Sequence, residues 1–87
     1  MTEERRRQRL RFRSWHRGTK EMDLLLGSFA DAHLPDFGSA QLAAYEALLT
    51  QNDPDLYNWI TGAELVPEAH KGEVMDLLLR HRYSSAS

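Results

Sequence analysis

The side chains best suited to chemistry are four histidines and one short charged stretch, Arg17-Gly18-Thr19-Lys20-Glu21. The histidines are scattered along the chain at positions 16, 33, 70 and 81, and no pair has the spacing of a known metal-binding motif. The chain has no cysteine, so disulfides and thiolate metal sites are excluded. We therefore predict no metal site and assign the histidines structural or surface roles.

Motifs of the common enzyme classes do not occur either. The sequence has no GxSxG nucleophile elbow, no phosphate-binding loop and no GxGxxG dinucleotide fingerprint. Glu21 and Asp23 resemble a catalytic carboxylate pair, but residues two apart on a helix point in different directions. A single domain of 87 residues also buries too little surface to build a deep, dry cleft. We predict no catalytic residue and no enzyme activity.

Arg17 and Glu21 stand four residues apart, so an ion pair across one helical turn is the simplest interpretation. Two features oppose it. The base precedes the acid, which is the weaker orientation against the helix dipole, and Gly18 between them is unfavourable inside a helix. A sharp backbone turn, or the close approach of another protein, explains the glycine better. On the residues alone, both the internal ion pair and the contact with a partner stay open.

Charge is distributed unevenly although the formal net charge is only −2. Residues 1–20 carry eight bases and two acids, whereas residues 21–70 carry nine acids and no base. The arginines predict either a solvated helix face or a docking surface for an acidic partner or nucleic acid. The acidic middle and the sequence pI near 6.0 oppose nucleic acid, which we keep as the alternative.

Hydrophobic spacing predicts one all-α domain over residues 1–87, a small five-helix bundle. The helices are expected over residues 3–16, 19–32, 39–51, 53–61 and from Pro67 to about His81. A basic arm at 1–8 and a tail at 83–87 are expected to be flexible. The predicted N-caps are Thr19, Ser39 and Asp53, and Gly62 is predicted to end the fourth helix. Phe12, Trp15 and Trp59 are expected to reach the core.

The basic start of the chain is similar to a mitochondrial presequence. Glu3 and Glu4 oppose that interpretation, as does the direct passage of the basic run into the Arg17–Glu21 stretch. We expect a mature bacterial cytoplasmic protein, with the mitochondrial matrix as the alternative. Wholly apolar runs such as the three leucines at 24–26 and at 77–79 are far short of the ~20 residues that span a bilayer, so no membrane insertion is predicted.

Two segments carry a resemblance to a known family. Residues 17–21, RGTKE, fit an RGxxE motif, and residues 53–60, DPDLYNWI, fit a DPDL-aromatic-NW segment. At this separation the pair resembles the SdhE-type family, also called succinate dehydrogenase assembly factor 2 or flavinator proteins. The resemblance covers about residues 9–80. Many members have two arginines before the glycine, where this chain has His16 followed by Arg17.

The resemblance implies a small helical assembly factor, a chaperone for the flavoprotein subunit of succinate dehydrogenase or fumarate reductase. Such a protein promotes covalent attachment of FAD to a histidine of that subunit and binds no cofactor stably itself. By position, Arg17, Gly18 and Glu21 would form the partner-binding surface, with Trp15 and Met22 as apolar neighbours that could equally belong to the core. We expect a monomer. The alternative function is a small nucleic-acid-binding or antitoxin-like regulatory module.

Overall fold

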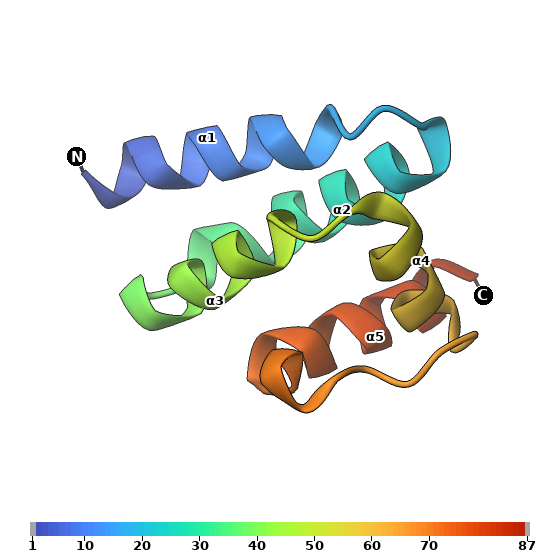
Figure 1. The fold of residues 1–87 in the computed structure, drawn as a ribbon. Helices are drawn as coiled ribbons and strands as arrows, with labels where there is room; N and C mark the ends of the chain where they lie inside the picture. Colours follow the sequence, from blue (N-terminus) through green and yellow to red (C-terminus); the bar gives the residue numbers. More distant parts are fainter. Residues whose placement is uncertain (1, 87) are drawn as a thin grey trace.

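Five α-helices make up the described part of the chain (Figure 1). The structure is a computed structural model that describes the backbone of residues 2–86 and the side chains of residues 2–81. The α-helices are α1 (Glu3–Trp15), α2 (Lys20–His33), α3 (Ser39–Leu49), α4 (Asp53–Thr61) and α5 (Glu73–Ala86). Two short 3-10 helices, η1 (Leu34–Asp36) and η2 (Glu68–His70), lie in the connections. Residues 2–86 contain no strand, so the predicted all-α bundle is confirmed.

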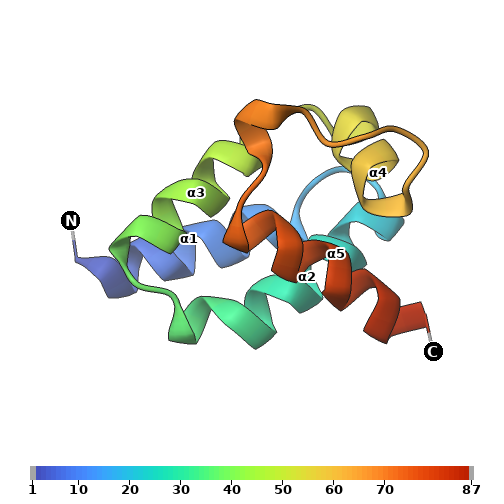
Figure 2. The same ribbon diagram turned by 90° about the horizontal axis from the view of Figure 1, so that it is seen from below.

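The first three helices run back and forth, as their short connections predict. Figures 1 and 2 show α2 returning along α1 and α3 returning along α2, while α4 lies at the end of the bundle where α1 turns into α2. Helix α5 packs against α2, α3 and α4. The turn between α1 and α2 therefore lies beside α4, which is more than thirty residues away in the sequence.

One apolar core is shared by all five helices. Its buried members are Leu10, Met22, Leu26, Phe29, Ala30, Leu34, Phe37, Leu42, Tyr45, Leu48, Leu49, Leu56, Trp59, Ile60, Val74, Met75 and Leu78. The core position predicted for Trp59 is confirmed. Two polar groups are buried with this cluster: the Ser14 hydroxyl donates to the Leu10 carbonyl at 2.7 Å and lies 2.6 Å from the Tyr45 hydroxyl. Burial raises the pKa of Tyr45 to about 12.

Helix α1 meets the core through different residues from those expected. Leu10 and Ser14 point inward, whereas Phe12 is 63 % exposed, so the prediction that Phe12 fixes the helix to the core is wrong. Trp15 is half-buried and lies across Gly27 of α2, where an added Cβ would come within 2.2 Å of the indole Cδ2. Position 27 therefore has to be glycine for α1 and α2 to pack this closely.

The helix caps agree with the sequence analysis at α2 and differ at two other helices. The Thr19 hydroxyl accepts from the Met22 amide at 3.2 Å, as predicted. At α4 the cap is Asn52, whose side-chain oxygen accepts from the Asp55 amide at 3.3 Å. The prediction of Asp53 as cap is wrong by one residue, and its carboxylate is thereby available for a distant contact. At α3 the cap is Gly38 rather than Ser39.

The last helix begins later than predicted. Pro67 leads only into η2, and α5 starts at Glu73. Gly72 has φ of +155°, which interrupts the helix, and its carbonyl accepts from the Asp76 amide at 2.9 Å. Residues 3–8 of the expected arm lie in α1 and residues 83–86 of the expected tail in α5, while Ser87 lies outside the described residues. The flexibility of both ends stays a prediction.

Candidate functional site

The turn that joins α1 to α2, residues 16–19, is called the corner here. The side chain of Arg17 bonds it to the end of α3 and the start of α4. The Arg17 guanidinium lies 2.7 Å (Nη2) and 2.9 Å (Nε) from Oδ1 of Asp53 at the start of α4. It also donates to the Leu49 carbonyl at 2.9 Å and to the Gln51 carbonyl at 3.1 Å. These carbonyls lie at the end of α3 and just beyond it, where a helix leaves acceptors without intrahelical donors. Only 11 % of the Arg17 side chain is exposed.

Gly18 forms the outermost point of the corner. Its φ is +117°, a conformation that residues with a side chain rarely adopt. A Cβ placed there would meet no atom within 4 Å, so a side chain at this position would project into open space. The backbone turn that the sequence analysis proposed for this glycine is confirmed. The close approach of another protein is a separate prediction that the geometry permits.

Glu21 makes no contact with the Arg17 guanidinium, which is bonded to Asp53. It is exposed and has no ion pair or side-chain hydrogen bond within residues 2–81. The ion pair between Arg17 and Glu21 is thus not formed, because Asp53 takes the guanidinium instead. The backbone contributes to this separation, since the Arg17 amide donates to Oδ1 of Asp23 at 2.6 Å. The two charged residues of the motif face different surroundings.

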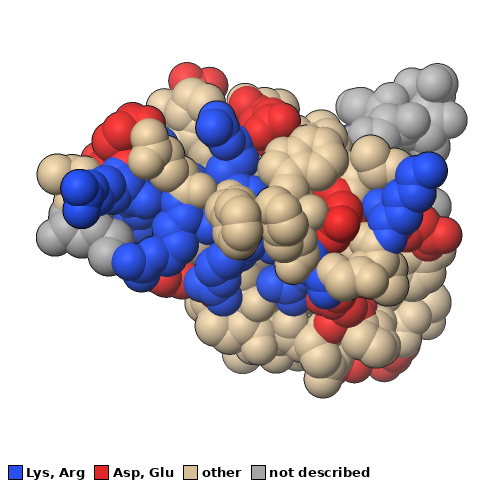
Figure 3. Space-filling model, turned by 90° about the horizontal axis from the view of Figure 1, so that it is seen from above, with Lys and Arg blue, Asp and Glu red and all other residues tan. Residues whose placement is uncertain are grey.

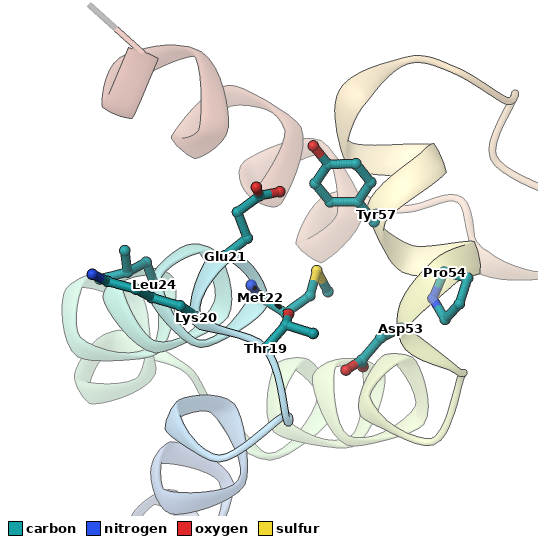
Figure 4. A pocket seen from close by; sticks show the side chains of 8 residues that line it. All are labelled: Thr19, Lys20, Glu21, Met22, Leu24, Asp53, Pro54 and Tyr57. Carbon is teal, nitrogen blue, oxygen red and sulfur yellow. Dashed lines mark hydrogen bonds between the residues drawn. The ribbon is translucent and has the colours of Figure 1, made fainter.

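An open groove of about 640 Å³ lies beside the corner, between the start of α2 and α4. Its lining residues are Thr19, Lys20, Glu21, Met22, Leu24, Asp53, Pro54 and Tyr57 (Figure 4). In Figure 4, α2 supplies one wall and α4 the other, with the Met22 side chain between them. Leu24 is 51 % exposed and Tyr57 is 37 % exposed, two of the four large hydrophobic side chains most open to solvent among the described residues.

The groove can hold an apolar segment with a positive charge beside it. Its walls are largely apolar, and Glu21 and Lys20, both exposed, add one charge of each sign to its lining. Among the described residues, no buried side-chain nitrogen or oxygen lacks a hydrogen-bond partner. The arrangement is that of a recognition surface with apolar contacts at its centre and charge at its edge.

Met22 and Trp15, the two apolar candidates, lie in different places. Met22 is 3 % exposed and belongs to the core, while its side chain also forms the floor of the groove. Trp15 lies away from the groove, where its indole Nε1 donates to Oδ1 of Asp31 at 3.3 Å. The structure therefore brings Gly18, Glu21 and Met22 to one region, places the Arg17 side chain beneath it and leaves Trp15 outside it.

Sequence analysis missed several residues of the groove. Leu24 was given no site role. Asp53, Pro54 and Tyr57 entered only through the DPDLYNWI segment, with Asp53 also predicted as a helix cap. One signal could have found the two hydrophobic residues. Leu24 falls outside the apolar stripe of α2, and Tyr57 falls outside the stripe of Leu56, Trp59 and Ile60 on α4. A large apolar residue off the buried stripe faces solvent or a partner.

The histidines and helices give no other candidate site. Residues 2–81 contain no group of three potential metal ligands, and no helix in the part of the chain described is long and apolar enough to cross a bilayer. His81 lies 2.9 Å from the Ser28 hydroxyl, and its ring packs against those of Phe29 and His33. Burial, and secondly the proximity of His33, lower the pKa of His81.

Comparison with known proteins places these features in one family. Residues 8–82 match the family model described as the flavinator of succinate dehydrogenase. The chain is 44 % identical over 80 residues to succinate dehydrogenase assembly factor 2-B, mitochondrial, of Drosophila mojavensis, covering 90 % of this chain and 51 % of the relative. It is 44 % identical over 78 residues to succinate dehydrogenase assembly factor 2, mitochondrial, of Dictyostelium discoideum, covering 90 % of this chain and 55 % of the relative. The chain thus spans about half the length of these curated relatives.

Proposed function

We propose that this chain, which belongs to the family of succinate dehydrogenase flavinators, binds the flavoprotein subunit of succinate dehydrogenase and promotes the covalent attachment of FAD to it. Membership of that family is the observation that carries the proposal. The family is one of assembly factors rather than enzymes, as the sequence analysis predicted. The attachment of FAD to a histidine of the partner is the finer part of the proposal, and it rests on the resemblance given above.

The binding site proposed for the flavoprotein is the outer side of the corner together with the groove. The exposed side chains of Leu24 and Tyr57 would be covered by the partner, which removes apolar surface from water. Gly18 leaves room for a partner's backbone to approach, since no atom lies near its missing side chain. The exposed carboxylate of Glu21 offers a charge-assisted contact to a basic group.

Arg17 supports this surface from beneath. Its contacts join the corner to Asp53 on α4 and to the carbonyls of Leu49 and Gln51. Since the two walls of the groove come from α2 and α4, the Arg17–Asp53 pair fixes how far apart they stand. We propose that Arg17 is a positioning residue, and that Gly18 and Glu21 meet the partner directly.

The proposed mechanism is orientation rather than chemistry by this chain. The bond between flavin and histidine would form within the flavoprotein, which holds both reactants. A rigid bundle bound across the flavoprotein stabilises the arrangement in which histidine and flavin are correctly placed, and so lowers the orientational cost of the reaction. The chain itself is proposed to hold no FAD stably and to act as a monomer.

Reconstitution from purified components tests this proposal. The flavoprotein is prepared without covalent flavin and incubated with FAD, with and without this chain. Covalent flavin is then read by fluorescence after denaturing electrophoresis. We expect a several-fold faster gain of fluorescence with the chain present, and equal rates with and without it would contradict the proposal. Running the assay in parallel with the flavoprotein of fumarate reductase decides which client is served.

The compartment is a further part of the proposal. The curated relatives are named as mitochondrial proteins, which supports the mitochondrial matrix, the alternative of the sequence analysis. The bacterial cytoplasm stays a prediction. Fractionation of the source cells with an antibody against the chain separates the two compartments.

A further inference from the structure

The outer face of α1 carries arginines that the fold does not use. Arg5, Arg9 and Arg13 follow one another at four-residue intervals and so share one side of the helix. None of their side chains has an ion pair or hydrogen bond among the described residues; Arg5 and Arg9 are exposed, and Arg13 is half-buried. Like charges at four-residue intervals on a helix repel one another weakly, and the acidic groups of a partner would relieve this repulsion.

The other arginines of α1 are engaged. Arg6 pairs with Glu46 at 3.1 Å and Arg11 lies 3.8 Å from Asp31. Arg7 donates to the Leu34 carbonyl at 3.0 Å and pairs with Glu3 at 3.4 Å. These contacts neutralise the acids nearest to α1, which leaves the charge of the free arginines uncompensated. Figure 3 shows the basic side chains gathered on the face of the molecule that α1 covers.

An aromatic pair continues this row of arginines. Phe12 is 63 % exposed, and its ring is stacked on that of His16 with centroids 4.0 Å apart and an angle of 19° between the rings. His16 Nδ1 lies 2.7 Å from the Phe12 carbonyl, which fixes the imidazole in place. An exposed phenylalanine held rigidly by a neighbour is the kind of side chain that anchors a protein interface.

We propose that the basic stripe, formed by Arg5, Arg9, Phe12, Arg13 and His16, is a second docking surface that binds an acidic patch on the flavoprotein. This inference rests on the proposed function. The stripe ends at His16, which opens the corner, and the corner leads directly to Thr19 and Lys20 at the groove. One partner can therefore cover both surfaces, with its apolar segment in the groove and its acidic patch along α1.

Charge favours an acidic protein surface over nucleic acid as the occupant. Three free arginines and one exposed aromatic ring make a small footprint, whereas tight binding to a phosphate backbone uses many more cations. A net charge of −2 and an acidic middle segment also repel a long polyanion. A few peripheral charges are enough, in contrast, to steer a protein partner and to set its orientation.

Steering has a kinetic signature that separates the stripe from the groove. Exposed charges chiefly raise the association rate constant and make it sensitive to salt, while contacts in an apolar groove chiefly slow dissociation. The stripe should therefore control how fast the two proteins meet, and its exposed Phe12 should add to the lifetime of the complex.

Stopped-flow or surface-plasmon measurement of binding to the flavoprotein tests the stripe. The variant is Arg5→Glu with Arg9→Glu, and the control is Lys71→Glu with Arg80→Glu, which changes the net charge equally at exposed positions elsewhere. In low salt the association rate constant should fall about tenfold or more in the stripe variant and much less in the control. In the stripe variant, the association rate constant should also depend less strongly on ionic strength. Phe12→Ala should raise the dissociation rate several-fold.

The possible failures are distinguishable. If the unaltered chain does not bind the flavoprotein, the proposed function fails and the stripe proposal falls with it. If the unaltered chain binds and the stripe variant associates as fast as the control, the stripe proposal alone is overturned. A labelled single-stranded oligonucleotide gives a second test. The stripe proposal is also overturned if the unaltered chain binds the oligonucleotide and the stripe variant does not, while both bind the flavoprotein equally well. Circular dichroism confirms that each variant is folded.

Discussion

The inner side of the corner, formed by the Arg17 side chain, differs in burial and in bonding from its outer side, formed by Gly18 and the neighbouring Glu21. On the inner side, Arg17 is 11 % exposed and its guanidinium contacts a carboxylate and two carbonyls. On the outer side, Gly18 has no atom near its missing side chain, and Glu21 is exposed with no partner in residues 2–81. Residues that are adjacent in one five-residue motif thus have separate tasks.

This difference supports the proposal that one motif combines a structural residue, Arg17, with residues that meet a partner. Arg17 joins the corner to α3 and α4, so its removal should act first on stability. Glu21 joins nothing within the described chain, so its removal should act on binding alone. Stability and binding should therefore separate among variants of these residues, and the largest effect is expected at Arg17.

Arg17→Ala should have the largest effect on stability. It leaves the half-buried carboxylate of Asp53 and two carbonyls without their donor, and the free energy of unfolding should fall by about 3 kcal/mol. Urea unfolding followed by circular dichroism measures this loss. Arg5→Ala is the matched control, because Arg5 is exposed and unpaired among the described residues, and it should change stability by less than about 0.5 kcal/mol. A loss below about 1 kcal/mol for Arg17→Ala would show that the contacts of Arg17 do not stabilise the fold substantially.

Leu24→Ala should weaken binding to the flavoprotein by about tenfold, roughly 1.4 kcal/mol, while leaving stability nearly unchanged. Leu24 is 51 % exposed in the groove, so the partner rather than the fold would bury it. Leu65 provides the control, since it is 94 % exposed and does not line the groove. Calorimetry with the two variants compares them. Equal losses of affinity for Leu24→Ala and Leu65→Ala would remove the groove from the binding site.

Glu21→Ala should reduce affinity for the flavoprotein by a few-fold, about 0.5–1 kcal/mol, because it removes one charged contact at the edge of an interface. The melting temperature should change little, as Glu21 supports no other described residue. Asp36→Ala, in η1 beyond the other end of α2, is the control. If Glu21→Ala melts the domain instead, the carboxylate has a structural role and the two sides of the corner do not differ.

Acid should lower stability slightly through His81, a residue that lies outside the corner. Burial and His33 hold the pKa of His81 below its ordinary value of 6.5, so the unfolded chain binds this proton more readily than the folded chain. Stability is therefore fully present above about pH 6.5 and falls as the pH drops below it. His81→Gln should flatten this dependence in urea unfolding between about pH 7.5 and about pH 5.5.

This histidine also provides a control on the comparison. His81 contacts Ser28 of α2 and the ring of Phe29, not the groove. At neutral pH, His81→Gln should keep its affinity for the flavoprotein. Reduced affinity in this variant would mean that binding follows any disturbance of the fold, and that the division between inner and outer sides is not the cause.

Local sequence predicted the helices and missed the contact that organises the site. Periodic apolar residues and Thr19 define α2 because these signals lie within a few residues of one another. The partner of Arg17 is Asp53, 36 residues away, and no local pattern distinguishes that carboxylate from Glu21. The one-residue error at the α4 cap had the same origin, since Asn52 and Asp53 are both good caps and only the ion pair decides between them.

The central claim, that the outer side of the corner meets the flavoprotein, is tested most directly by the rate of covalent flavinylation with Gly18→Arg and Gly18→Ala. Both variants carry the backbone strain of φ +117°, about 1–3 kcal/mol, but only arginine adds bulk on the exposed side. With both proteins folded by circular dichroism, we predict that the alanine variant keeps most of the flavinylation rate and the arginine variant loses nearly all of it. Equal rates for the two variants, whether high or low, would contradict the claim.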